Sequence, residues 1–175
     1  MRDIPVTDLL KAVVIGMLAL TLSACGFQLR GKAELPFETL YIEGGNPALN
    51  AELQRAVSIG SRTRIVATPS EAQAVLQIFN ESREKRILSL SGVGRVNEFL
   101  LVQRVAFRLR DRNSRIMLPD QLIELRRDMS YDDTLVLAKE SEEAMLYRDM
   151  QGDVVNQILR RLSGAKPAPP EEPDN

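Results

Sequence analysis

Histidine is absent from the 175-residue chain, and cysteine occurs only once. Without histidine, the protein lacks the commonest general base near neutral pH and the commonest metal ligand. A single cysteine can form neither an intramolecular disulfide nor a cluster of thiolates. These two absences exclude Ser-His-Asp and Cys-His catalysis. Only enzymes built on carboxylates or lysine remain, and we expect neither an enzymatic activity nor a cofactor.

A surplus of charge of one sign is also missing. Lysine and arginine number 23 against 24 aspartates and glutamates, which gives a formal net charge of −1. Nucleic-acid-binding proteins usually carry a basic surplus, so we expect no nucleic-acid partner. Apolar residues make up 44% of the chain and charged residues 27%, a balance that can bury a core. The length predicts one domain with extensions at its ends.

The single cysteine follows a short apolar run near the N-terminus. Residues 12–22 are apolar except for Gly16 and Thr21, and this run is too short to span a bilayer, which needs about 20 residues. The run ends in the sequence LSAC, which resembles the lipobox of bacterial lipoproteins rather than the end of a core helix. We therefore predict a lipoprotein signal peptide over 1–24 and lipid attachment at Cys25.

Lipid attachment at Cys25 would determine where the mature protein works. In lipoprotein processing, the thiol accepts a diacylglyceryl group before cleavage, and the freed amine takes a third acyl chain. Each methylene buried in lipid contributes about 0.8 kcal/mol, so three chains make the anchoring effectively permanent. Gly26 rather than aspartate follows the cysteine, which by resemblance to lipoprotein sorting rules favours the outer membrane. We expect a lipid-anchored protein on the periplasmic side of that membrane.

The rest of the chain alternates between strand and helix patterns. Strand patterns occur in this order: 39–45, 64–73 (a short strand and a loop), 74–91, 95–111 and 116–130. Helical spacing of apolar residues covers 48–60, where Asn46 is the expected cap, and 138–162. The proline-rich stretch 164–175 predicts a disordered tail.

The strand pattern at 95–111 separates apolar and basic residues onto two sides. The apolar side carries Phe99, Leu101, Val105, Phe107 and Leu109. Helices covering this side would bury it and leave the other side open. We therefore predict an α+β domain over 25–163, a two-layer sandwich with two helices on one face of a small mixed, mostly antiparallel four-stranded sheet.

Arg104, Arg108 and Arg110 lie on the opposite side of the same strand pattern. They are either the solvated outer face of a half-covered sheet or an anion-binding face, because guanidinium groups bind phosphates bidentately and keep their charge. Three further basic residues lie on the strand expected to pair with it, namely Arg83, Lys85 and Arg86. In the periplasm, the abundant phosphate-bearing partner is the lipid A end of lipopolysaccharide.

Carboxylate pairs and a glycine-bearing turn offer no catalytic site. Asp132-Asp133 and Glu142-Glu143 are adjacent in sequence, so their side chains point in different directions, whereas paired acid/base catalysis needs carboxyls that face one another. The turn at 91–94 lacks the lysine and the spacing of a phosphate loop. We interpret it as a hairpin tip, a kind of loop that often carries binding.

Three segments, taken in order, resemble the LptE family. They are 25–31 (CGFQLRG), 94–101 (GRVNEFLL) and 127–162, which begins RDMSYDD and ends NQILRRL. The resemblance implies a scaffold and not an enzyme: a lipoprotein that sits as a plug inside the LptD β-barrel, is needed for assembly of that barrel, and binds lipopolysaccharide. It also implies a fold of two helices against a four-stranded sheet.

The same resemblance points to two lipopolysaccharide-binding residues. The lysine of the family's Ala-Lys segment matches Lys139. A second basic position of the family lies in the hairpin before an Asn-Glu-Phe motif; here that place falls within 91–94, and the nearest basic residue is Arg95. The alternative function is a periplasm-facing lipoprotein that binds another anionic ligand or a cell-wall polymer without a barrel partner.

Overall fold

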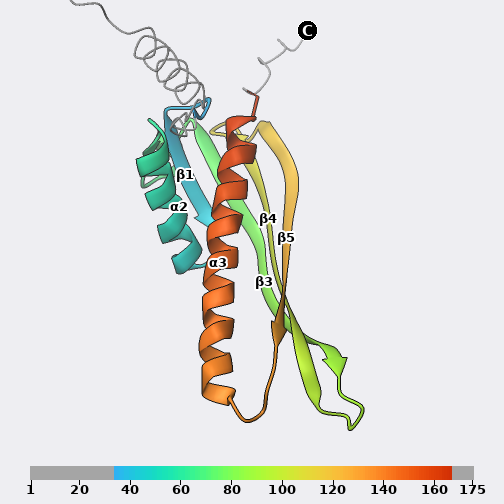
Figure 1. Ribbon diagram of the computed structural model, residues 1–175. Helices are drawn as coiled ribbons and strands as arrows, with labels where there is room; N and C mark the ends of the chain where they lie inside the picture. The colour runs from blue at the N-terminus through green and yellow to red at the C-terminus, as the bar shows by residue number, and fades with distance from the viewer. Residues whose placement is uncertain (1–33, 167–175) are drawn as a thin grey trace, which may run out of the picture. The chain divides into compact units, whose positions relative to one another are not determined.

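The computed structural model describes residues 34–166 (Figure 1). Its strands are β1 (Thr39–Gly44), β2 (Arg64–Ile65), β3 (Ala74–Leu90), β4 (Val96–Asp111) and β5 (Ile116–Ser130). Its helices are α2 (Pro47–Gly60), the short 3-10 helix η1 (Pro69–Glu71) and α3 (Val136–Ser163). The predicted signal peptide, Cys25 and the tail beyond residue 166 lie outside the described residues.

The strands form one mixed sheet in the order β2-β1-β3-β4-β5. β1 is parallel to β2 and β3, whereas β3, β4 and β5 follow one another as antiparallel hairpins. Both α-helices lie on one face of the sheet (Figure 1), which confirms the predicted α+β two-layer sandwich. The described sheet has five strands instead of the expected four, because Arg64 and Ile65 pair with Thr39 and Leu40 along the outer edge of β1.

Local signals explain where the helices begin. The Asn46 side-chain oxygen accepts a hydrogen bond from the backbone N–H of Leu49 at 2.8 Å, so α2 starts and ends where the sequence predicts. α3 begins at Val136, two residues before the predicted start at 138, because Val136 and Leu137 are exposed and do not continue the buried apolar stripe of the helix. Within the described residues, no helix combines the length and apolar character needed to cross a bilayer.

The apolar side of β4 packs against the helices, as predicted. Phe107 is completely buried at the centre of the main core. Around it lie residues from the sheet and from both α-helices, including Leu49, Leu53, Leu76, Val105, Leu109, Val154 and Ile158. This burial is the main stabilising contribution to the fold, since each fully buried aliphatic or aromatic side chain is worth about 1.5–3 kcal/mol.

A second, smaller apolar cluster lies farther along the same face. Leu101, Met129 and Met150 form it, and the rings of Phe99 and Tyr147 pack against it. It occupies the part of the sheet where β3, β4 and β5 extend past the end of β1 and only α3 covers them (Figure 1). The domain therefore has two cores on one side of one sheet.

Polar side chains lie where the two cores meet. Arg83 Nη2 donates to Gln151 Oε1 at 2.7 Å, and Gln151 Nε2 donates to Glu52 Oε2 at 2.7 Å. Gln103 occupies the corresponding position of β4, opposite Arg83 in the register. Its side chain is completely buried, and neither amide atom has a hydrogen-bond partner among the described residues. A buried polar group left unpaired costs about 1–3 kcal/mol.

Side chains bond backbone carbonyls on the part of β3 beyond β1 and on the edge strand β5. Beyond the end of β1, the Tyr147 hydroxyl donates to the backbone carbonyl of Glu84 at 2.8 Å on the β3 edge. On β5, Arg161 donates to the carbonyl of Leu122 at 3.1 Å, and Arg127 donates to the carbonyl of Arg126 at 3.0 Å. These carbonyls are therefore not free to pair with an added strand.

Replacing the unpaired amide should stabilise the protein. We expect Gln103→Leu to raise the free energy of unfolding by about 1–3 kcal/mol, because leucine has a similar volume and carries no polar group to satisfy. Urea denaturation followed by circular dichroism measures this change.

Gln151→Leu is the matched control for Gln103→Leu. The Gln151 amide bonds both Arg83 and Glu52, so the same substitution there should lower the stability. A Gln103→Leu protein that is no more stable than the wild type would contradict the assignment of Gln103 as an unpaired amide.

Candidate functional site

The end of the domain farthest from its described termini gathers both predicted lipopolysaccharide-binding residues. We call this the distal end: the hairpin turn 91–95, the connection 131–135 between β5 and α3, and the first turn of α3. Figure 1 shows these segments together, whereas the described chain begins and ends at the opposite end of the sheet. Because β3, β4 and α3 are long, the distal end lies away from the larger core.

The hairpin turn has the form that the sequence predicts. The Ser91 N–H donates to the Arg95 carbonyl at 2.7 Å, and the Gly94 N–H donates to the Ser91 carbonyl at 2.9 Å. Gly94 has a φ of +80°, a conformation that glycine adopts without strain. The turn leaves the Arg95 side chain 72% exposed.

The hairpin lies against the connection that leads into α3. The Tyr131 N–H donates to the Asn97 carbonyl at 2.7 Å, and the rings of Tyr131 and Phe99 meet edge to face at 5.0 Å between centroids. Arg95 Nη1 lies 3.3 Å from Asp133 Oδ2. An open hollow of about 630 Å³ lies between the two segments, and Arg95 and Tyr131 are among its lining residues. The hairpin and the connection thus form one surface.

Lys139 is held more tightly than Arg95. Its side chain is only 14% exposed, and its Nζ donates to Ser130 Oγ at 3.0 Å and to Glu142 Oε2 at 2.8 Å. These bonds tie the first turn of α3 to the end of β5. Lys139 and Arg95 therefore lie at the same end of the domain. The Lys139 side chain is mostly buried there, whereas the Arg95 side chain is mostly exposed.

Asp132 belongs to the turn before α3, as the sequence analysis suggests. Its carboxylate accepts hydrogen bonds from the backbone N–H of Thr134 at 2.9 Å and from the Thr134 hydroxyl at 2.7 Å. These bonds, together with the positive charge of Lys139, hold the pKa of Asp132 below its ordinary value. The carboxylate is therefore ionised at neutral pH and serves to fix the turn.

Exposed apolar side chains are concentrated at the distal end and on the adjoining end of β3. Seven of the twelve large apolar side chains exposed in the described part of the chain lie here or on the adjoining end of β3: Ile87, Leu88, Leu90, Val93, Leu135, Val136 and Leu137. We did not predict this group from the sequence. The sequence feature that indicates this group is the run Leu135-Val136-Leu137, directly before the predicted helix. Polar residues are usual at such exposed positions.

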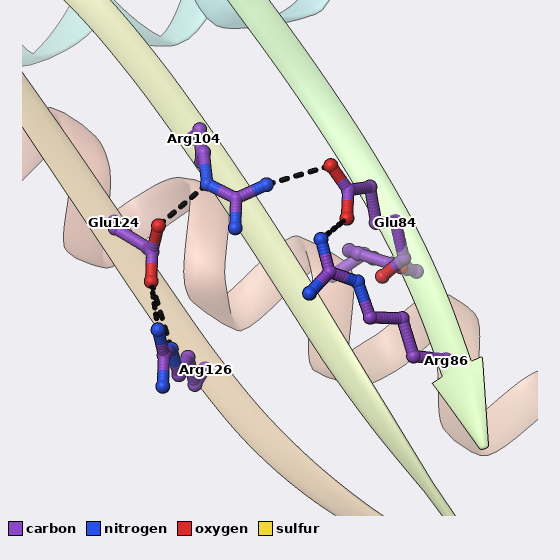
Figure 2. Close-up of polar contacts among 6 residues, drawn as sticks. Glu84, Arg86, Arg104, Glu124 and Arg126 are labelled. Atoms are coloured by element: carbon purple, nitrogen blue, oxygen red, sulfur yellow. Dashed lines mark hydrogen bonds and ion pairs between the residues drawn. The ribbon is translucent and has the colours of Figure 1, made fainter. Parts of the chain in front are cut away.

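The three strand arginines lie on the outer face, by which we mean the face of the sheet opposite the helices. Arg104 donates to Glu84 on β3 through Nη1 at 2.6 Å and to Glu124 on β5 through Nε. Arg86 and Arg126 bind the remaining oxygens of these two carboxylates. Figure 2 shows the five side chains in front of the strands, with α3 behind them.

The other two predicted arginines also lie beside carboxylates. Arg110 Nη2 donates to Glu43 Oε2 at 3.1 Å. Arg108 Nε lies 3.5 Å from Asp120 Oδ1, which is too long for a hydrogen bond. The outer face therefore holds the three arginines together as predicted, but negative charges accompany each of them, and the anion-binding face stays a prediction.

The basic residues of β3 divide between the two faces. Arg86 joins the outer face, whereas Arg83 and Lys85 turn toward α3. Lys85 Nζ lies 2.6 Å from Glu143 Oε2 and 4.3 Å from the centroid of the Phe99 ring. Strand alternation separates neighbours in this way, so the six basic residues do not form one patch.

Acid should weaken the outer-face ion pairs. The hydrogen bond from Arg86 holds the pKa of Glu84 below its usual value, and the bond from Arg104 does the same for Glu124. Because the folded pKa lies below the unfolded value of about 4.3, this stabilisation is present above about pH 4.3 and is lost as the pH falls through the folded value. We expect urea denaturation to show stability declining on acidification below about pH 4.3.

The double variant Glu84→Gln/Glu124→Gln tests the source of this decline. It removes both titrating groups, so its stability should fall less steeply than that of the wild type between about pH 5 and 3. Glu140→Gln is the control, since Glu140 is exposed and makes no ion pair in the described part of the chain. Parallel pH profiles for the double variant and the wild type would assign the acid sensitivity to other carboxylates.

Comparison with known proteins shows the family. The family model described as LptE: Lipopolysaccharide-assembly matches residues 37–162. The LPS-assembly lipoprotein LptE of Photorhabdus laumondii subsp. laumondii is 25% identical over 158 residues, which cover 86% of this chain and 83% of that protein. This match agrees with the resemblance noted in the sequence.

Solved structures share the fold. The solution NMR structure of the uncharacterized lipoprotein B from Nitrosomonas europaea is 46% identical and has a TM-score of 0.68, covering 79% of this chain and 90% of that one. The crystal structure of the rare lipoprotein B from Shewanella oneidensis is 25% identical with a TM-score of 0.61, covering 72% of this chain and 94% of that one. The family match spans well over half of the chain, and this protein therefore belongs to the LptE family of non-enzymatic lipopolysaccharide-assembly lipoproteins.

Proposed function

We propose that this protein is an outer-membrane lipoprotein that sits as a plug inside the LptD β-barrel, assists assembly of the barrel, and binds lipopolysaccharide during its delivery to the cell surface. The outer face carries this proposal. It is a sheet face without a helix over it, and its charged side chains are matched with one another. The inner wall of a large membrane barrel is polar and wet, so a plug needs a surface of this kind.

The anchor in this proposal is Cys25. Three acyl chains on the cysteine would hold the mature protein in the outer membrane with the domain on the periplasmic side. Family membership supports this placement, because the matched relatives are named as lipoproteins.

Lipopolysaccharide binding is proposed at the distal end. Lipid A carries phosphates beside acyl chains, and the distal end carries cations beside exposed apolar side chains. Arg95 is the better placed of the two predicted residues, because its guanidinium is mostly exposed and its contact with Asp133 is long. Lys139 would have to exchange its bond with Glu142 for a phosphate. We propose the distal end ahead of the outer face as the lipopolysaccharide site. Carboxylates already lie beside all three outer-face candidates, Arg104, Arg108 and Arg110.

Affinity purification tests the barrel partnership. The full-length lipidated protein, extracted from outer membranes in mild detergent, should bring down LptD as the main partner identified by mass spectrometry. Recovery of the protein as a free monomer would contradict the plug. Saturable glycan binding without a barrel would favour the rival, a lipoprotein for a cell-wall polymer or another anionic ligand.

Substitutions at the distal end test the ligand contacts. Arg95→Asp and Lys139→Asp should each weaken lipopolysaccharide binding about tenfold or more, because a charge-assisted hydrogen bond is worth about 1.5–3 kcal/mol, while recovery of the barrel stays unchanged. Surface plasmon resonance with immobilised lipopolysaccharide measures the affinity. Lys139→Gln is included because Lys139 also stabilises the start of α3.

Arg62→Asp is the matched control for the distal substitutions. Arg62 is also an exposed arginine in a long ion pair, 3.7 Å from Glu34, but it lies outside the distal end. This variant should bind lipopolysaccharide like the wild type. If Arg95→Asp and Lys139→Asp also bind normally, the ligand contacts lie elsewhere on the molecule.

A further inference from the structure

Three neighbouring apolar side chains lie among the charged residues of the outer face. Ala106 of β4 pairs with Asn80 of β3 on one side and with Leu122 of β5 on the other. Phe79 precedes Asn80 at a register shift in β3, so its ring is 45% exposed, and the Leu122 side chain is 57% exposed. We call Phe79, Ala106 and Leu122 the outer-face patch.

Arg108 joins the outer-face patch and has unused hydrogen-bonding capacity. Its guanidinium lies 5.0 Å from the centroid of the Phe79 ring, which places Phe79 on the outer face. Its Nε is buried without a hydrogen-bond partner among the described residues. Arg104, in contrast, donates to two carboxylates. The only carboxylate beside Arg108 in the described residues is that of Asp120, at 3.5 Å, so the guanidinium gains charge-assisted hydrogen bonds when a closer acceptor arrives at its exposed N–H groups.

A hollow borders the patch on the β3 side. It measures about 480 Å³, is open to solvent, and is lined by residues 78–83 of β3 together with Gly45 and Asn46 at the end of β1. Phe79 therefore stands beside a space that can receive a side chain from another molecule. On the neighbouring β3 edge, the Glu84 carbonyl already accepts a hydrogen bond from the Tyr147 hydroxyl, so it is not free to pair with an added strand.

We propose that the outer-face patch is the surface through which this protein docks onto a polypeptide wall, with apolar partner side chains covering Phe79 and Leu122 and a partner carboxylate binding Arg108. The proposal rests on the proposed function, which makes that wall the inside of the barrel. It adds the face that contacts the wall and the residues that anchor it there.

The charges around the patch favour a protein over a phosphorylated lipid. Four carboxylates, Glu43, Glu84, Asp120 and Glu124, lie among the arginines of the outer face, so the face has little net positive charge to hold a multiply charged phosphate group. A single partner carboxylate needs only one guanidinium, and the carboxylate beside Arg108, that of Asp120, lies too far away for a hydrogen bond. Aromatic and arginine side chains ringed by polar groups are also typical of the centres of protein interfaces.

Crosslinking tests the docking face. A photoreactive amino acid at Leu122 in the full-length lipidated protein should form a covalent adduct with the barrel on irradiation of cells. The same amino acid at Ile59 is the control, because Ile59 is an apolar α2 residue that is 70% exposed on the helix-covered side. Adducts with the barrel from Ile59 and none from Leu122 would overturn the proposal.

Charge substitutions give a second, quantitative readout. Phe79→Asp and Leu122→Asp should each lower the amount of LptD recovered with the full-length protein at least about tenfold, whereas Ile59→Asp should leave it unchanged. Thermal unfolding of each purified variant checks that the fold survives, as expected for side chains already half exposed. If the wild type recovers LptD and both patch variants recover it equally well, the docking face is wrong while the plug stands. If the wild type recovers none, the proposed function fails, and the docking face fails with it.

Discussion

The alternation of side chains along β4 is the constraint on which the rest of the structure depends. Phe107 and Leu109 point into the core, while Arg108 and Arg110 point to the outer face. A shift of one residue in the pairing of β4 would exchange the two sets and bury the arginines. The same register therefore fixes the hydrophobic core, the ion pairs of the outer face, and the row of residues that we assign to partner docking.

Unequal element lengths give the domain two ends with different properties. β1 and α2 stop partway along the sheet, whereas β3, β4, β5 and α3 continue past them (Figure 1). The extension has only the small cluster around Leu101 and Met150 as its core. Its tip carries Arg95 and Lys139 among exposed apolar side chains, far from the point where the described chain begins. Ligand binding and partner docking can thus occupy separate surfaces of one sheet.

Local patterns predicted most of the fold and less of the site. The period-two alternation of β4 and the Asn46 cap are readable from neighbouring residues, so the two layers and the start of α2 follow from the sequence. The contact between Arg95 and Asp133 joins residues 38 positions apart and depends on how β5 leads into α3. The exposure of Phe79 depends on a register shift between β3 and β4, which no local pattern reveals.

A structure of the protein bound to its partner, solved by electron cryomicroscopy from detergent-solubilised outer membranes, would show directly whether the outer face lies against the barrel wall. We expect the domain inside the LptD barrel, with the outer face against the wall and Phe79 and Leu122 covered by barrel residues. We also expect lipopolysaccharide, when present, to contact the distal end at Arg95. A domain outside the barrel, or one that turns α2 and α3 to the wall and leaves the outer face uncovered, would contradict this arrangement.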